Sequence, residues 1–306
     1  MKTTVKIALA AGAVLVAGPA MAEENWSQHL PGVTEGLPAG ALPPKGVYFI
    51  NDTMALPGAL YNNNGDKTPV KADVFVDVPV LLWNPGVKVL GADYALGVAQ
   101  PLTYVNSRGG GLNQSAAGHF STIVIPGQFS WSLPNDFHVL TGLAVYLPDG
   151  TAQKTVISYP GGNYAGVPNS TNYWTVEPTL GLSWLHDGWN ISASFNYDIN
   201  FENTASHYTS GDVLVGDYTL TKTIGKWTVG LGGYSVNQLQ DDKSSVAAVQ
   251  AGITAANGNR QTKYAAGPIV GYDFGPLALT GTYNHGFGAN NVISGDTFWT
   301  RMLIPF

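Results

Sequence analysis

The chain has 306 residues, of which 14 are basic and 20 acidic, and it contains no cysteine. Only 11% of the residues are charged, against about 25% in ordinary soluble domains, while glycine reaches 38 residues and aromatic residues 11%. The acidic balance argues against a nucleic-acid partner, and the lack of cysteine excludes disulfides, a thiol nucleophile and a thiolate metal site.

The first 22 residues have the pattern of a secretory signal peptide. Lys2 and Lys6 precede an apolar run from Ile7 to Ala17, and small residues end at Ala22, where cleavage is expected. The run is too short for a bilayer, which needs about 20 apolar residues, and no other stretch of comparable length exists. Without the two lysines, 12 basic residues face 20 acidic ones, so the mature chain carries a net charge of −8.

Residues 23–45 are expected to be irregular. Pro31, Pro38, Pro43 and Pro44 stand among several glycines, and proline can join neither a ladder strand nor a stable helix. This segment precedes the first strand.

From residue 46 onward, apolar and polar residues alternate in long segments. Between Trp189 and Glu202 every second residue is apolar and every other one is polar, without a break. Fourteen alternating residues exceed the usual soluble strand of about 5 to 6 and suffice for a tilted membrane strand of about 9 to 11. The pattern predicts twelve strands, near residues 46–56, 70–83, 87–104, 119–132, 136–147, 171–186, 188–202, 211–223, 226–238, 260–274, 276–288 and 296–306.

The connections between these strands alternate between short turns and longer polar loops. Five short turns, for example at 84–86 and 186–188, separate six longer loops, near 57–69, 105–118, 148–170, 203–210, 239–259 and 289–295. Outer-membrane barrels have an even strand number, short periplasmic turns and long external loops. The sequence therefore predicts an all-β fold, a transmembrane antiparallel β-barrel of about 12 strands closed by its first and last strands; a secreted β-sandwich is the alternative.

Aromatic residues support the membrane location. Five tryptophans lie near the short turns and would form a girdle there: Trp83, Trp131, Trp184, Trp189 and Trp227. Six tyrosines would lie near the opposite rim: Tyr61, Tyr104, Tyr146, Tyr173, Tyr208 and Tyr234. The last strand alternates and ends in Phe306, which is typical of outer-membrane barrel proteins.

Several segments also resemble a known family. The run from Val33 to Asn51, the segment Tyr173-Trp-Thr-Val-Glu-Pro178, the strand from Trp189 to Asn203 and the end Leu303-Ile-Pro-Phe306 are similar to outer-membrane proteins associated with the meta-cleavage pathway of phenol degradation. That family is regarded as transporters akin to the long-chain fatty-acid transporter barrels. The resemblance implies passive uptake of small hydrophobic or aromatic compounds, with no cofactor, and leaves the solute open.

Selectivity in such a channel would depend on residues that face the lumen. Alternation places there Trp299 and the charged residues Lys71, Asp73, Asp77, Asp93, Glu177, Asp198, Glu202, Asp217, Lys263, Asp273 and Arg301. Two interpretations stay open, contact with the solute and salt bridges that stiffen the wall. Arg301, in the closing strand, is the first candidate for mutation.

We expect residues 23–45 to fold into the lumen as a plug, as the N-terminal segment does in the related fatty-acid transporters; a periplasmic tail is the alternative. Prolines inside predicted strands, Pro79, Pro126, Pro178 and Pro268, could open a side passage or only distort the wall. A structural or adhesive barrel is an alternative function. An outer-membrane hydrolase is a weaker one, with His119 and Ser121 as its candidate pair. Outer-membrane lipid is the expected surrounding, and the oligomeric state is open.

Overall fold

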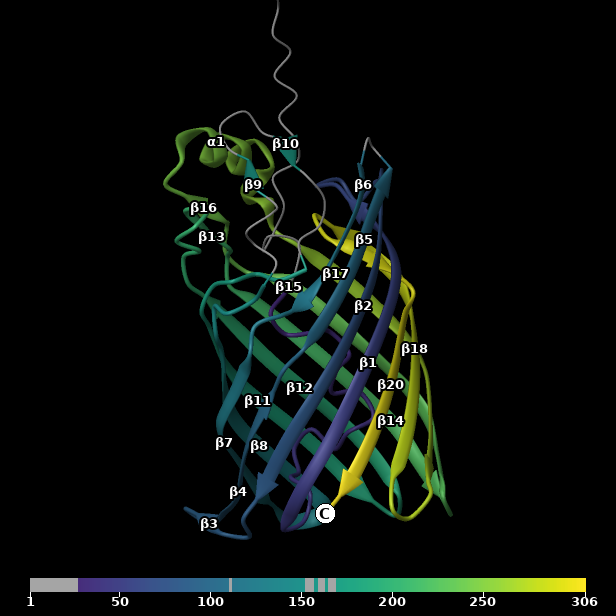
Figure 1. The fold of residues 1–306 in the computed structure, drawn as a ribbon. Helices are drawn as coiled ribbons and strands as arrows, with labels where there is room; N and C mark the ends of the chain where they lie inside the picture. Colours follow the sequence, from purple (N-terminus) through teal and green to yellow (C-terminus); the bar gives the residue numbers. More distant parts are fainter. Residues whose placement is uncertain (1–26, 110–111, 152–156, 159–162, 165–168) are drawn as a thin grey trace, which may run out of the picture.

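The computed structural model describes residues 27–109, 112–151, 157–158, 163–164 and 169–306. The expected signal peptide, residues 1–22, lies outside the described residues. Twelve antiparallel spans form the wall of one barrel (Figure 1). They are β1 (Gly46–Tyr61), β2 (Lys67–Asn84), β4 with β5 (Ala92–Ala99, Leu102–Gly109), β6 with β7 (Leu112–His119, Ile123–Ser132), β8 (Phe137–Tyr146), β11 (Thr175–His186), β12 (Trp189–Asn200), β14 (Val213–Ile224), β15 (Trp227–Gln238), β17 (Thr262–Asp273), β18 (Ala278–Asn290) and β20 (Thr297–Pro305).

The barrel closes between its first and last spans. β1 pairs with β2 from Gly46↔Asn84 upward and with β20 from Tyr48↔Pro305 to Ala55↔Phe298. All twelve predicted strands are confirmed, and so is the closure. Three predicted loops are mostly strand. Most of residues 105–118 is a β5–β6 hairpin, because Leu102–Gly109 continues to pair with Leu112–His119, and residues 57–69 and 289–295 are also largely strand.

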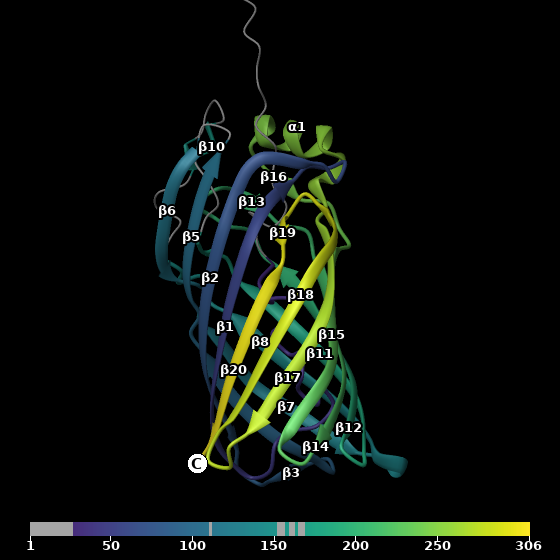
Figure 2. The same ribbon diagram turned by 90° about the vertical axis from the view of Figure 1, so that its right-hand side faces the viewer.

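The two ends of the barrel differ, as Figures 1 and 2 show. At one end, which we call the turn end, tight turns join the strands. One of them puts Asp187 and Gly188 at positive φ, 46° and 74°, so glycine suits the second position. The C-terminus lies at the same end.

At the other end, the loop end, lie helix α1 (Ala247–Ala255) and the short strands β9 (Ile157–Ser158), β10 (Asn163–Tyr164), β13 (Tyr208–Thr209) and β16 (Lys243–Ser244), with β19 (Ile293–Gly295) near the rim. The sequence predicts only a polar loop where α1 lies. A short strand β3 (Lys88–Val89) and a 3-10 turn (Pro134–Asp136) lie at the turn end, and a second 3-10 turn (Asn257–Asn259) follows α1. Within the part of the chain that the structure describes, no helix has the length and apolarity that crossing a membrane requires.

The prolines within strands interrupt their ladders locally and leave the wall continuous. Pro178 pairs with Leu143 of β8 but falls in a gap of the β11–β12 register, and Pro268 pairs with Leu231 of β15 but falls in a gap toward β18. Pro126 lies in register shifts of both the β7–β8 and the β4–β7 ladder. The structure thus shows local distortion at each of these three sites, and the ladders resume on either side of it.

The aromatic girdle is clear at the turn end. Trp83, Trp189 and Trp227 are exposed on the outer wall there. The tyrosines predicted near the opposite rim do not form a matching outer girdle, because only Tyr104 of them is among the exposed large side chains. Four of the six are buried: Tyr146, Tyr173, Tyr208 and Tyr234. Three of these hydroxyls donate to or share a bond with buried polar groups, which only an inward or covered tyrosine can do.

Candidate functional site

Residues 27–45 lie inside the barrel, and strand side chains hold their backbone. Asp217 of β14 accepts three hydrogen bonds from this segment: Gly32 N at 2.8 Å, Thr34 N at 3.0 Å and Thr34 Oγ1 at 2.7 Å. Gly36 N donates to Thr219 Oγ1 of the same strand at 2.9 Å. The segment forms no strand or α-helix of its own. Polar side chains of the inner wall therefore satisfy the three amides just named.

His29 is enclosed by carboxylates. Its Nδ1 lies 3.1 Å from Glu177 Oε2, its Nε2 lies 3.7 Å from Asp217 Oδ2, and its backbone N donates to Asp198 Oδ2 at 3.1 Å. Tyr146 also donates its hydroxyl to Glu177 Oε2 at 2.7 Å. Every member of this group is buried, so the two carboxylates beside the ring favour its protonated, imidazolium form.

Arg301 of β20 anchors the middle of the segment. Its Nε donates to Asp52 Oδ1 of β1 at 2.7 Å, its Nη1 donates to Glu35 O at 2.9 Å, and its Nη2 donates to Val33 O. On the neighbouring strand β18, Asn284 Nδ2 donates to both oxygens of the Glu35 carboxyl, at 3.0 and 2.9 Å. A guanidinium that bonds a carboxylate and two carbonyls at once fixes both strand and segment.

Trp299 and the lower residues complete the contacts. Trp299 Nε1 donates to Pro31 O at 3.2 Å. Gly40 N donates to Ser183 Oγ at 2.7 Å, and Ser130 Oγ donates to Gly40 O at 2.8 Å. Near the turn end, Asn84 Nδ2 donates to Pro43 O at 2.8 Å. The segment is therefore held from the His29 level down to the first residues of β1.

The inner wall has two chemically different sides. Polar residues of β11, β12, β14, β18 and β20 carry most of the bonds just described, whereas the middle parts of β1 and β2 present apolar side chains inward. Met54, Leu56, Val74, Val76 and Val78 are buried there in one cluster with Leu30 of the N-terminal segment. A small enclosed space of about 20 Å³, bordered by Leu30, Met54, Leu56 and Val74 among others, lies between segment and wall. It has room for about one water molecule.

Six of the nine principal predicted lumen residues lie on the inner side. Glu177, Asp198, Asp217, Trp299 and Arg301 contact the N-terminal segment as given above. Lys263 places its Nζ 5.8 Å from the centre of the inward Tyr234 ring. Whether any of them contacts a solute stays a prediction.

Four predictions of inward orientation are wrong. Asp73 and Asp77 share the outer face of β2 with the exposed Phe75, as does Lys71, because the alternate residues Val74 and Val76 are the buried ones. Apolar residues occupy both faces of β2, so the alternation does not determine which face is outside. Glu202 follows the end of β12 and pairs with His207 at 3.2 Å in an exposed loop.

Several residues that hold the segment have no distinguishing signal in the sequence. His29 had no assigned role, and Asp52, Ser183, Thr219 and Asn284 are ordinary inward polar residues until the segment's path is known. Only the inward alternation of each strand could have suggested them. Among the described residues, no three His, Asp or Glu side chains are grouped so as to hold a metal ion.

The candidate hydrolytic pair is not assembled. His119 Nε2 bonds to the carbonyl oxygen of Asp149, and Ser121 Oγ is buried without a hydrogen-bond partner among the described residues. A nucleophile needs its base within hydrogen-bond reach, and here the base bonds elsewhere.

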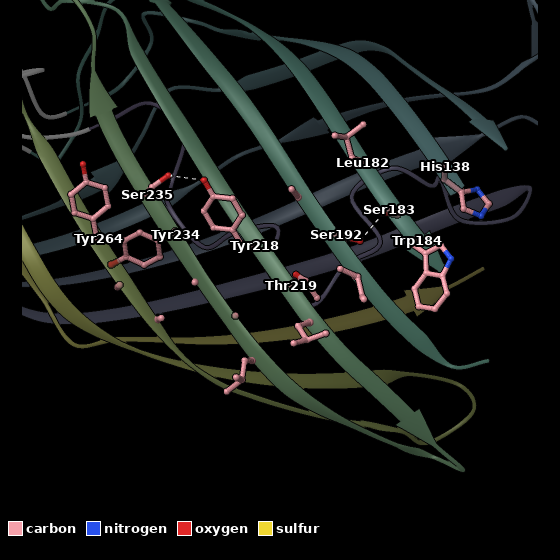
Figure 3. Close-up of a pocket in the computed structure, with 18 of the residues that line it drawn as sticks. His138, Leu182, Ser183, Trp184, Ser192, Tyr218, Thr219, Tyr234, Ser235 and Tyr264 are labelled. Carbon is pink, nitrogen blue, oxygen red and sulfur yellow. Dashed lines mark hydrogen bonds between the residues drawn. The ribbon is translucent and has the colours of Figure 1, made fainter. Parts of the chain in front are cut away.

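A hollow of about 870 Å³ lies on the outer wall over β8, β11, β12, β14, β15 and β17. Figure 3 shows Leu182, Trp184 and Tyr218 among its lining residues, with the hydrogen bond between Tyr218 and Ser235. It forms because small residues such as Ala193, Gly233 and Ala266 stand among these large ones. Its lining is almost wholly apolar, as a surface in contact with lipid should be.

A closed twelve-stranded antiparallel barrel with an exposed apolar belt, a tryptophan girdle and an internal N-terminal segment defines an outer-membrane β-barrel. The turn end is then periplasmic and the loop end extracellular. The chain belongs to the family described as Putative MetA-pathway of phenol degradation, whose model matches residues 58–302.

Among solved structures, the chain is similar to the COG4313 outer membrane channel from Pseudomonas putida F1, with a TM-score of 0.69 and 12% identity over 91% of this chain and 100% of that one. The β domain of the Bordetella autotransporter Brka (TM-score 0.49, 12% identity, 86% and 100% covered) and the CymD monoaromatic hydrocarbon channel (0.38, 10%, 86% and 89%) are more distant. At these identities the solved structures establish the fold alone. No curated protein matches the sequence. These findings place the chain among outer-membrane β-barrels.

Proposed function

We propose that this protein is a channel for passive uptake of small hydrophobic or aromatic compounds across the outer membrane, and that residues 27–45 plug its lumen. One observation carries the proposal: the inner face of β1 and β2 is apolar, with Met54, Leu56, Val74, Val76 and Val78 turned toward the N-terminal segment. Channels for water-soluble solutes have polar interiors. An apolar inner strip is suited to solutes that dissolve poorly in water.

The family and the similar outer membrane channel support this reading. The description of CymD as a monoaromatic hydrocarbon channel agrees with the solute class that the phenol-degradation family suggests. Which compound is carried, and whether it leaves toward the periplasm or through the wall, the proposal leaves open.

The test is uptake by cells with and without the protein, using radiolabelled phenol, an alkane and a sugar. The proposal expects faster entry of the aromatic compound with the protein present and an unchanged rate for the sugar. Equal rates for the aromatic compound would argue against a transport role.

A matched pair of variants addresses the apolar strip. Val74→Thr puts a hydroxyl of the same shape into the inner strip, whereas Val98→Thr makes the same change at an exposed valine of the outer wall. A buried hydroxyl without a partner costs about 1–3 kcal/mol, so a solute path along the strip predicts slower aromatic uptake for Val74→Thr alone. Equal effects of the two would contradict that path.

Deletion of residues 23–42 tests the plug. A plug predicts greater influx of small antibiotics after the deletion, and unchanged permeability would mean that these residues do not obstruct the lumen. This outcome is independent of which solute the channel carries.

A further inference from the structure

The outer wall carries a group of polar residues at a depth where lipid is expected. Asn51 and Thr53 of β1, Asp77 of β2 and Thr300 of β20 share one face, and we call them the outer polar island. Thr53 pairs in register with both Asp77 and Thr300, so the four lie on three adjacent strands. The exposed Phe75 and Phe298 stand beside them on the same face.

The orientation of the island follows from the buried residues between its members. Met54 and Val76 alternate with Thr53 and Asp77 and are 4% and 0% exposed inside the barrel. Asp52, between Asn51 and Thr53, points inward to Arg301. Since successive side chains of a strand point to opposite faces, the island faces outward.

Hydrogen bonding within the island is incomplete. Asp77 Oδ1 accepts from Asn51 Nδ2 at 2.7 Å and from Thr53 Oγ1 at 3.0 Å. Asp77 Oδ2 takes no hydrogen bond from a described residue, and the Thr300 hydroxyl has no such partner either. One acceptor oxygen and at least one donor therefore remain available at the surface.

The island lies within the membrane belt by its distance from the girdle. Asp77 is six residues along β2 from Trp83, which is about 20 Å of strand, or about 15 Å of height at the usual tilt. Four residues further up, Asp73 pairs with Arg108 at 2.7 Å, and such an exposed ion pair suits the outer boundary of the belt. Hydrocarbon can donate nothing to a carboxylate at this depth, so ionisable groups here mark functional surfaces.

We propose that this wall is the interface of a homodimer in the outer membrane, in which the outer polar island of one copy faces that of a second copy. Two observations select this occupant. The island carries its own complement, an acceptor in Asp77 Oδ2 and a donor in the Thr300 hydroxyl, while Asn51 and Thr53 already donate to Asp77 Oδ1. A two-fold axis along the membrane normal keeps each residue at the same depth in both copies, so these groups meet at one height.

Lipid is the competing occupant, and it fits the opposite wall better. The hollow over β11 to β17 is almost wholly apolar, and its Tyr218 and Ser235 hydroxyls bond to each other at 3.1 Å. No carboxylate is left unmatched there among the residues that line it. The dimer inference does not rest on the uptake function, because it concerns the outside of the barrel.

The absence of cysteine allows a direct test in intact outer membranes. Thr53→Cys places one thiol at the centre of the island, and Ala193→Cys places one in the outer hollow as a control. Treatment with a short bifunctional thiol reagent should give a product of twice the monomer mass for Thr53→Cys and not for Ala193→Cys. A monomer in both cases, with both thiols reactive toward a simple maleimide, would overturn the proposal.

Asp77→Leu in the Thr53→Cys background gives the second test. Leucine suits lipid, so this barrel should still fold, as its heat-dependent gel mobility would show. A polar contact within a membrane contributes enough to lower the cross-linked fraction about fivefold when it is lost. An unchanged cross-linked fraction in the folded variant would show that Asp77 does not hold the two copies together, which would contradict an interface formed by the island.

Discussion

Replacing Asp217 by asparagine should release the upper part of the N-terminal segment. The carboxylate accepts from Gly32 N, Thr34 N and Thr34 Oγ1 and lies 3.7 Å from His29 Nε2. The Asp217→Asn side chain keeps one acceptor oxygen, while its amide group turns a donor toward donors. Hydrogen bonds to charged groups contribute about 1.5–3 kcal/mol each, so losing one side of the carboxylate and its charge costs about 3 kcal/mol.

That free energy corresponds to a shift of about a hundredfold in the equilibrium between docked and released segment. Ser27→Cys supplies the probe, because Ser27 is buried and a thiol closely matches the hydroxyl in size. In this background, Asp217→Asn should raise the rate of maleimide labelling by about one to two orders of magnitude. The control is Asp187→Asn, which removes an exposed carboxylate that pairs with Lys222 in a turn and makes no bond to the segment. Equal labelling rates in the parent and Asp217→Asn would refute the view that Asp217 holds the segment.

Two further predictions test the lower anchor and an external loop. Gly181→Ala should lower the melting temperature and expose the segment to protease, because a Cβ there would lie 1.9 Å from Ala39 O; Gly281→Ala, whose nearest neighbours are 4.0 Å away, should change little. Burial raises the pKa of Asp242, between β15 and β16, from its ordinary 3.8 to about 6. Because the folded state binds this proton more tightly, the loop should be most stable at acidic pH and lose stability as pH rises through 6. The Gly211 amide donates to the Asp242 carboxyl, so its hydrogen-exchange rate, corrected for intrinsic rates, should show this loss of stability. Asp242→Asn should abolish the pH dependence.

The barrel could be predicted from the sequence because lipid and lumen impose opposite demands on alternate residues. Between Trp189 and Asn200 the two demands never conflict, and the observed strand ends within two residues of the predicted one. Helix α1 could not be predicted in this way, since only Val249 and Ile253 are buried on it and it packs in the external cap rather than in the wall.

The orientation of β2 was unpredictable for a physical reason. From Val74 to Leu82 apolar residues occupy both faces, because this strand has lipid outside and an apolar part of the N-terminal segment inside. Alternation reports a difference between the two surroundings, and here the difference is small. The two aspartates of this strand, Asp73 and Asp77, therefore favour the prediction of a polar inner face, which β2 does not have.

The same asymmetry bears on how a solute could pass. On the β14 side the segment is bound through amides that only a strong acceptor such as Asp217 can satisfy, and an apolar solute could not replace those bonds. On the β1 and β2 side, Leu30 touches the wall through apolar contacts alone, which a hydrophobic molecule can exchange for contacts of its own at little cost. For the proposed channel, the passage of least resistance therefore runs between the segment and β2, while the bonds to β14 keep the segment from leaving the barrel.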